Sequence, residues 1–216
     1  MELKGKKILF LGDSITKGVG ASSPENRYTD VFARNTGAVI YNYGMSGTRI
    51  ARQIHPQPNC SIDVDDFNTR VDKMNDEADA VVVFGATNDF GHGDAPFGKF
   101  TDRSVFSFYG ALHTLILSLF DRYPTARIIF MTPLHRSSEY SYNDSPYHKM
   151  PLSEYARAIR EVCEYYSVPV LDLYKNSGIT TAVKRVKELY IPDGLHPSDL
   201  GARRIAEMLE GFMRAL

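Results

Sequence analysis

The chain has 216 residues, of which 43% are hydrophobic and 24% are charged, and these proportions are typical of one globular domain. Its 25 basic and 26 acidic residues give a formal net charge of −1, which offers no electrostatic reason to expect DNA, RNA or an anionic membrane as main partner. The longest apolar runs have the length of strands rather than the roughly 20 residues of a membrane-spanning helix. The N-terminal lysines and the short apolar run after them lack a signal-peptide cleavage pattern, so we expect a cytoplasmic protein.

Five short, mostly apolar segments are predicted to be β-strands buried on both faces, because they show little polar alternation. In chain order they are Lys7–Leu11, Val39–Tyr43, Ala80–Phe84, Arg127–Met131 and Val168–Leu171. Between and after them, apolar residues recur three and four positions apart at 64–74, 108–119, 155–166 and 205–212, as in amphipathic helices. This alternation predicts one α/β domain over residues 1–216, a parallel sheet with helices on both faces.

The carboxyl ends of the strands are where such a sheet binds ligands, so the segments that follow each strand carry the candidate site. The loops after the third and fourth strands, residues 90–108 and 134–150, are long and rich in aromatic residues, which predicts pocket walls or lids. Their aromatic and basic residues include Phe90, His92, Phe97, Phe100, His135, Arg136, Tyr140, Tyr142, Tyr147 and His148. The alternative is that the aromatic rings only pack these loops onto the body of the domain.

The first of these segments, GDSITKG, places Ser14 directly after a buried strand. It does not match a phosphate-binding P-loop or a dinucleotide fingerprint, and the chain contains no G-x-S-x-G nucleophile elbow. Two interpretations remain for Ser14, the N-cap of a helix or a nucleophile. Serine after a strand is a common N-cap, so the local sequence by itself favours the cap.

The segment YIPDGLHPSDLG near the other end of the chain favours the nucleophile, because it places Asp193 three residues before His196. A histidine becomes a useful general base when a carboxylate holds one ring nitrogen and fixes the tautomer. The alternative is an Asp-Gly turn with a surface histidine. Together with Ser14, however, the pair supplies the nucleophile, the base and the orienting carboxylate that serine acyl transfer requires.

Donors for an oxyanion are available at two other strand ends. In NYGMSGTR, the backbone N–H of Gly47 can approach a substrate closely, and in GATND the side-chain amide of Asn88 can donate. A turn glycine and a helix cap by Asn88 and Asp89 are the alternatives. Arg49 and Arg136 are candidates for contact with an anionic substrate, although exposed arginines usually only solvate a surface.

The four segments GDSITKG, NYGMSGTR, GATND and DGLHPSDLG resemble the four sequence blocks of the SGNH (GDSL) hydrolase family, in the expected order over residues 12–201. The resemblance implies a three-layer α/β/α sandwich with a flavodoxin-like, five-stranded parallel sheet, and a carboxylic ester hydrolase. The roles that it implies are nucleophile for Ser14, base for His196, orienting carboxylate for Asp193, and oxyanion partners for Gly47 and Asn88. Ile15 stands where leucine is usual, a change that leaves the chemistry untouched.

We therefore expect a serine esterase that works through an acyl-serine and needs no cofactor or metal, since the six histidines lack ligand-like spacing. The mixed aromatic and polar loops favour a small-molecule ester with a small acyl group, acetyl first, on a polar alcohol such as a carbohydrate. A lysophospholipase or thioesterase of the same fold is one alternative. A non-catalytic flavodoxin-like module, nucleotide-binding or receiver, is another, but it leaves Asp193, His196 and Asn88 unexplained.

Overall fold

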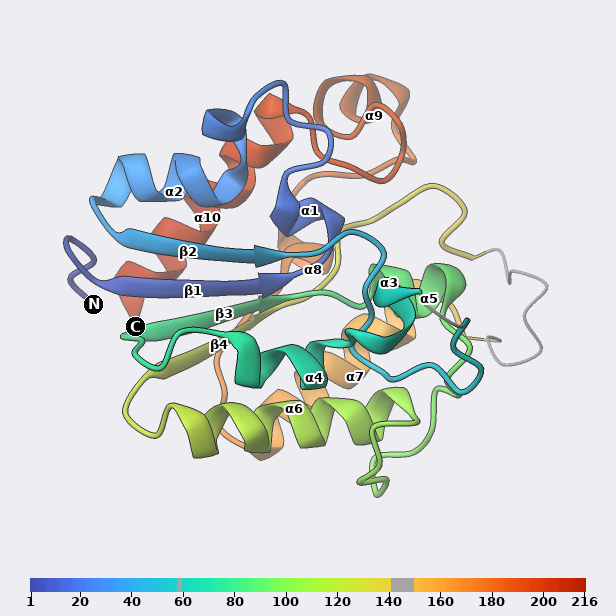
Figure 1. Ribbon diagram of the computed structural model, residues 1–216. Helices are drawn as coiled ribbons and strands as arrows, with labels where there is room; N and C mark the ends of the chain where they lie inside the picture. The colour runs from blue at the N-terminus through green and yellow to red at the C-terminus, as the bar shows by residue number, and fades with distance from the viewer. Residues whose placement is uncertain (58–59, 141–149) are drawn as a thin grey trace.

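Five parallel strands form the centre of the computed structural model, which describes residues 1–57, 60–140 and 150–216. The strands are β1 (Lys7–Gly12), β2 (Val39–Gly44), β3 (Ala80–Phe84), β4 (Arg127–Met131) and β5 (Val170–Leu171). They lie in the order β2-β1-β3-β4-β5 (Figure 1). The chain thus moves from β1 to one side for β2 and then crosses to the other side for β3. In sheets of this kind, ligands bind where the strand order reverses in this way, here beside β1.

The three central strands, β1, β3 and β4, are buried on both faces because helices cover both sides of the sheet, whereas the edge strand β2 is only partly buried, contrary to the prediction. Leu9 of β1 pairs in register with Val81 of β3 and faces one layer of helices, whereas Phe10 and Val82 face the other. All of these side chains are fully buried. The continuous apolar character of the strands, which predicted a parallel sheet, thus follows from burial on two faces.

Helices form two outer layers, so the three-layer α/β/α prediction is confirmed. Figure 1 shows α2 (Tyr28–Thr36) and α10 (Asp199–Ala215) on one face and α4 (Phe67–Arg70), α6 (Phe108–Arg122) and α7 (Leu152–Tyr165) on the other. The shorter helices are α1 (Ser14–Lys17), α3 (Ser61–Val64), α5 (Thr87–His92), α8 (Leu173–Asn176) and α9 (Lys184–Tyr190), with 3₁₀ turns η1 (Pro24–Asn26) and η2 (Val71–Lys73). Within the described ranges, no helix combines the length and the hydropathy needed to cross a bilayer.

Two predicted elements differ from the structure. The last strand is only Val170–Leu171, because Pro169 has no N–H with which to extend the ladder backwards to Val168. The segment 64–74 is not one helix but the separate pieces α3, α4 and η2. Asp66 causes the break, because its carboxylate accepts a hydrogen bond from the backbone N–H of Thr69 and thereby starts a new helix.

Three phenylalanines of the loop after β3 pack against the core rather than lining the candidate site. Phe90 and Phe97 are buried, and the Phe97 ring stacks on Phe108 with a centroid separation of 5.9 Å. Phe100 packs edge-on against the ring of His113 at 5.1 Å. The packing alternative is therefore correct for these three phenylalanines. Tyr142, Tyr147 and His148 of the second loop lie outside the described residues.

Candidate active site

Ser14 lies at the carboxyl end of β1, where the chain turns into α1. The N-cap of α1 is Asp13, whose Oδ1 accepts a 2.9 Å hydrogen bond from the N–H of Ile15. Ser14 is thus the first helical residue and not the cap, and its hydroxyl is available for another partner. That partner is His196, whose Nε2 lies 3.0 Å from the Ser14 Oγ.

His196 is held by the carboxylate of Asp193 in the loop before α10. Its Nδ1 lies 2.7 Å from Asp193 Oδ2, while Oδ1 accepts the backbone N–H groups of Leu195 and His196 at 2.8 and 2.7 Å. Partial burial opposes the charge of Asp193, but these hydrogen bonds outweigh it and hold its pKa below the ordinary value. An ionised carboxylate can only accept, so Nδ1 carries the proton and Nε2 accepts from the Ser14 hydroxyl.

Gly47 and Asn88 lie beside Ser14, as members of the same cavity lining. The backbone at Gly47 has a φ of +78°, a conformation that favours glycine. The N–H groups of Ser14 and Gly47 donate no hydrogen bond to another described residue. One N–H of the Asn88 amide donates to the carbonyl of Thr48 at 3.0 Å, which leaves the second for another acceptor. Three N–H groups are therefore free to meet an oxyanion.

A chain of hydrogen bonds that the sequence did not predict orients Asn88. Arg49 Nη1 donates to Asp63 Oδ1 at 3.0 Å, and Arg49 Nη2 lies 3.0 Å from Nδ1 of His92. A guanidinium can only donate, so Nδ1 accepts and the His92 proton sits on Nε2. That nitrogen lies 3.1 Å from Asn88 Oδ1, so it donates to the amide oxygen and turns the amide nitrogen the other way.

His92 is neutral in this arrangement. Removal of part of the ring from water, together with the charges of Arg49 and Arg136, lowers the pKa of His92 to about 4. The position of His92 four residues after Asn88, one helical turn along α5, was the available sequence signal for this contact. The expectation that Arg49 contacts a substrate is not met, because its side chain is buried and paired with Asp63.

Asp89 holds the backbone next to the candidate site and does not cap a helix. The N-cap of α5 is Ala86, which has no capping side chain, so neither Asn88 nor Asp89 has that role. The Asp89 carboxylate instead accepts the backbone N–H groups of Ile50 and Ala51 at 3.0 and 2.8 Å. Burial raises its pKa to about 6. These bonds fasten the chain that follows Gly47 to the start of α5.

The candidate site opens into a cavity of about 410 Å³. Its lining consists of Ser14, Val19, Ser46, Gly47, Asn88, His92, Arg136, Leu195 and His196. Among these described residues, Val19 and Leu195 are the apolar side chains, and Arg136 carries the one permanent charge. Across the described parts of the chain, no group of three or more His, Cys, Asp or Glu side chains is placed to hold a metal ion.

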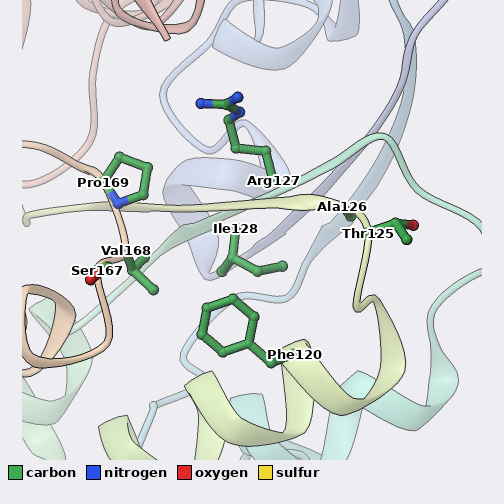
Figure 2. A pocket seen from close by; sticks show the side chains of 8 residues that line it. All are labelled: Phe120, Thr125, Ala126, Arg127, Ile128, Ser167, Val168 and Pro169. Carbon is green, nitrogen blue, oxygen red and sulfur yellow. The ribbon is translucent and has the colours of Figure 1, made fainter.

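A second hollow, of about 300 Å³, lies at the opposite edge of the sheet, where β4 begins. Figure 2 shows Phe120 and Ile128 facing one another on one side of β4, with Arg127 pointing to the other side. The residues that line it include none of the predicted site residues. Ser14 and its partners therefore lie in a different place from this hollow, at the carboxyl ends of the strands.

The five-stranded parallel sheet and its covering helices form the α/β fold of the GDSL (SGNH) hydrolases. Residues 10–204 match the model of the GDSL-like lipase/acylhydrolase family. The chain belongs to this family, whose members hydrolyse esters. No curated protein sequence matches the chain.

Solved structures with the same fold cover nearly the whole chain. A protein from Lactobacillus plantarum is 31% identical, with a TM-score of 0.83, and the match covers 99% of this chain and 98% of that one. A lipase/acylhydrolase from Enterococcus faecalis is 23% identical, with a TM-score of 0.68 and coverage of 97% and 96%. An acetyl xylan esterase is 19% identical, with a TM-score of 0.62 and coverage of 95% and 98%. The last two similarities concern the fold alone.

Proposed function

We propose that this protein is a serine esterase in which Ser14 is the nucleophile, His196 the general base and Asp193 the carboxylate that orients it. The supporting observation is the pair of hydrogen bonds that joins the three side chains, 3.0 Å from Ser14 Oγ to His196 Nε2 and 2.7 Å from His196 Nδ1 to Asp193 Oδ2. A nucleotide-binding or receiver module would have no use for this arrangement.

In the proposed reaction, Ser14 Oγ attacks the ester carbonyl carbon while His196 Nε2 takes up the hydroxyl proton. The N–H groups of Ser14 and Gly47 and the amide of Asn88 stabilise the oxyanion of the tetrahedral intermediate. The bond from carbon to the alcohol oxygen then breaks, and His196 returns the proton to the leaving alcohol. Water hydrolyses the acyl-serine by the same route, with His196 again the base.

The proposed substrate is a small acyl ester, acetyl first, of a polar alcohol such as a carbohydrate. The cavity of about 410 Å³ supports a small acyl group, because Val19 and Leu195 alone give it apolar walls and the described lining contains no long apolar channel. Hydroxyl, amide and guanidinium groups on the remaining walls suit a polar alcohol. The similarity in fold to an acetyl xylan esterase makes acetylated sugars a reasonable first choice for a panel.

Labelling with a fluorophosphonate probe tests the mechanism, since only an activated serine reacts with it. We expect the wild-type protein to be labelled and the Ser14→Ala variant to remain unlabelled, with at least about 10⁴-fold lower esterase activity. Thermal unfolding of both proteins checks that the variant is folded. A folded Ser14→Ala protein that retains full activity would rule out the proposed nucleophile.

A panel of p-nitrophenyl esters of increasing acyl length, assayed beside acetylated sugars, tests the substrate. We expect kcat/KM to be highest for acetate and to fall as the acyl chain becomes longer. A preference for long acyl chains would contradict the small-acyl proposal and favour a lysophospholipase. Faster hydrolysis of acyl thioesters than of matched oxygen esters would favour a thioesterase.

A further inference from the structure

Arg136, in the loop after β4, places a guanidinium in the wall of the cavity that contains Ser14 and His196. Its Nη1 donates to the carbonyl oxygen and the hydroxyl oxygen of Thr87, at 2.9 and 3.1 Å. The guanidinium carbon also lies 5.5 Å from the centre of the Phe90 ring. These contacts hold the charge in a fixed position beside the candidate nucleophile, unlike an arginine that moves freely in solvent.

The positive charge of Arg136 forms no ion pair with a carboxylate of the described residues. Two other arginines close to this part of the fold each form an ion pair, Arg49 with Asp63 at 3.0 Å and Arg52 with Asp66 at 2.8 Å. Within residues 1–57, 60–140 and 150–216, no carboxylate forms such a pair with Arg136, and its buried Nε has no hydrogen-bond partner. Burial lowers the pKa of Arg136, and the attraction of the buried Asp13 carboxyl, which acts in the opposite direction, does not outweigh it. A partly desolvated cation whose described hydrogen-bond acceptors are the neutral oxygens of Thr87 is costly, and an anionic ligand would offset that cost.

The loop that carries Arg136 is fastened to the loop that carries His196. The N–H of Ser137 donates a 2.7 Å hydrogen bond to the carbonyl of Gly194, which lies between Asp193 and His196. The guanidinium and the imidazole are thus held by directly connected segments. A substrate group bound by Arg136 would be fixed relative to Ser14 and His196, which is what positioning for attack requires.

We propose that Arg136 forms an anion subsite, and that the preferred ester carries a carboxylate in its acyl group or in its alcohol. This inference rests on the proposed esterase function and narrows its substrate class. Among the described residues of the cavity lining, Arg136 carries the one permanent charge, so this lining favours an anion over a neutral or cationic ester. A guanidinium is well suited to a carboxylate because its planar N–H groups match the carboxylate oxygens.

Arg136 also has a structural role through its contact with Thr87. A test of the anion subsite must distinguish the effect of losing this contact from an effect on substrate binding. Its hydrogen bonds to Thr87 hold the residue before Asn88, so loss of the guanidinium is expected to slow hydrolysis of every ester. Such an effect is the same for charged and neutral substrates. The ratio of kcat/KM between matched charged and neutral esters therefore isolates the subsite.

Two matched pairs of esters make this measurement. On the acyl side, p-nitrophenyl hemisuccinate is compared with its neutral methyl ester, and on the alcohol side p-acetoxybenzoate is compared with methyl p-acetoxybenzoate. We expect Arg136→Gln to lower the charged-to-neutral ratio about 10-fold or more in one pair, mainly through KM. The pair that responds identifies the side of the ester that carries the carboxylate. Arg136→Lys, which keeps the charge, is expected to retain part of the preference.

The matched control is Arg127→Gln, which makes the same charge change at the other end of β4 (Figure 2). It is expected to leave both ratios unchanged. Unchanged ratios in Arg136→Gln, or an equal loss for all four esters, would overturn the subsite. Hydrolysis of the neutral esters, with its loss in Ser14→Ala, tests the proposed esterase function separately, so failure of one proposal is distinguishable from failure of the other.

Discussion

Gly20 lies directly against His196, so close that it leaves no room for a side chain. A Cβ added to Gly20 would be 2.9 Å from the Cβ of His196 and 2.5 Å from the carbonyl oxygen of Pro197. The backbone at Gly20 also has a φ of +93°, which L side chains rarely adopt. The loop after α1 thus forms a wall behind His196 and helps to keep its ring within reach of Ser14.

Gly20→Ala is expected to displace His196 and to lower kcat about 10-fold or more, since small misplacements of reacting groups are costly. Gly5→Ala is the matched control, because Gly5 also has a positive φ, +74°, but has nothing within 4 Å of an added Cβ. It should lose about 1 kcal/mol of stability through backbone strain and no activity. Equal kcat values for the two folded variants would show that the Gly20 wall does not position His196.

Removal of the Asn88 amide tests the proposed oxyanion donor. Asn88→Ala is expected to lower kcat by about 10² to 10³-fold with little change in KM, because the amide bond to the oxyanion exists mainly in the transition state. Steady-state kinetics with p-nitrophenyl acetate measure both constants. A variant that loses thermal stability but keeps its kcat would assign Asn88 a structural role through its hydrogen bond to Thr48.

Because His92 is hydrogen-bonded to Asn88, we expect His92 to affect catalysis by holding the Asn88 amide in position. His92→Ala is expected to lower kcat by roughly 10- to 100-fold, because the freed amide is no longer held in one orientation. The sharper test is a double-mutant cycle: in an Asn88→Ala background, loss of His92 should cost nothing further. Additive losses would contradict the coupling. His55→Ala, at an exposed histidine in another loop, serves as the control and should leave kcat unchanged.

The buried carboxyl group of Asp13 is expected to make the stability of the folded protein depend on pH. Burial raises its pKa from an ordinary value of 3.8 to about 7. The folded protein therefore holds this proton more tightly than the unfolded chain, and the resulting stability is complete below pH 3.8 and is lost as the pH rises to about 7. Asp13→Asn keeps the oxygen that accepts from Ile15 but cannot ionise.

Thermal unfolding of both proteins at pH 5 and pH 8 measures this effect. We expect the melting temperature of the wild type to fall more between these two pH values than that of Asp13→Asn. Asp89, with a pKa of about 6, contributes with the same sign to both proteins, so the difference between them isolates Asp13. An identical fall in both proteins would show that Asp13 is already ionised at pH 5 in the folded state.

The sequence was most informative where the signal was local. Continuous apolar runs located the strands, and the loop containing Asp193 and His196 could be identified because both residues lie within four positions. Apolar spacing does not reveal the break in segment 64–74, because the break comes from the carboxylate of Asp66, which starts a new helix. The link between Arg49 and His92 could not be predicted, since it depends on how the loop after β2 folds over α5.

Ser14 and His196 lie 182 positions apart in the sequence. The rate of ester hydrolysis therefore depends on whether these two distant segments are folded together, as well as on the chemistry. The proposed nucleophile begins α1, directly after the first strand, whereas the proposed base is carried by the loop that precedes α10. Because α10 packs on α2, partial unfolding that releases it would separate base from nucleophile while β3 and β4 remain paired. During gentle denaturation, activity should therefore disappear before circular dichroism registers loss of the sheet. A phosphonate attached to Ser14 and hydrogen-bonded to His196 would connect these two segments and so stabilise the protein against this partial unfolding.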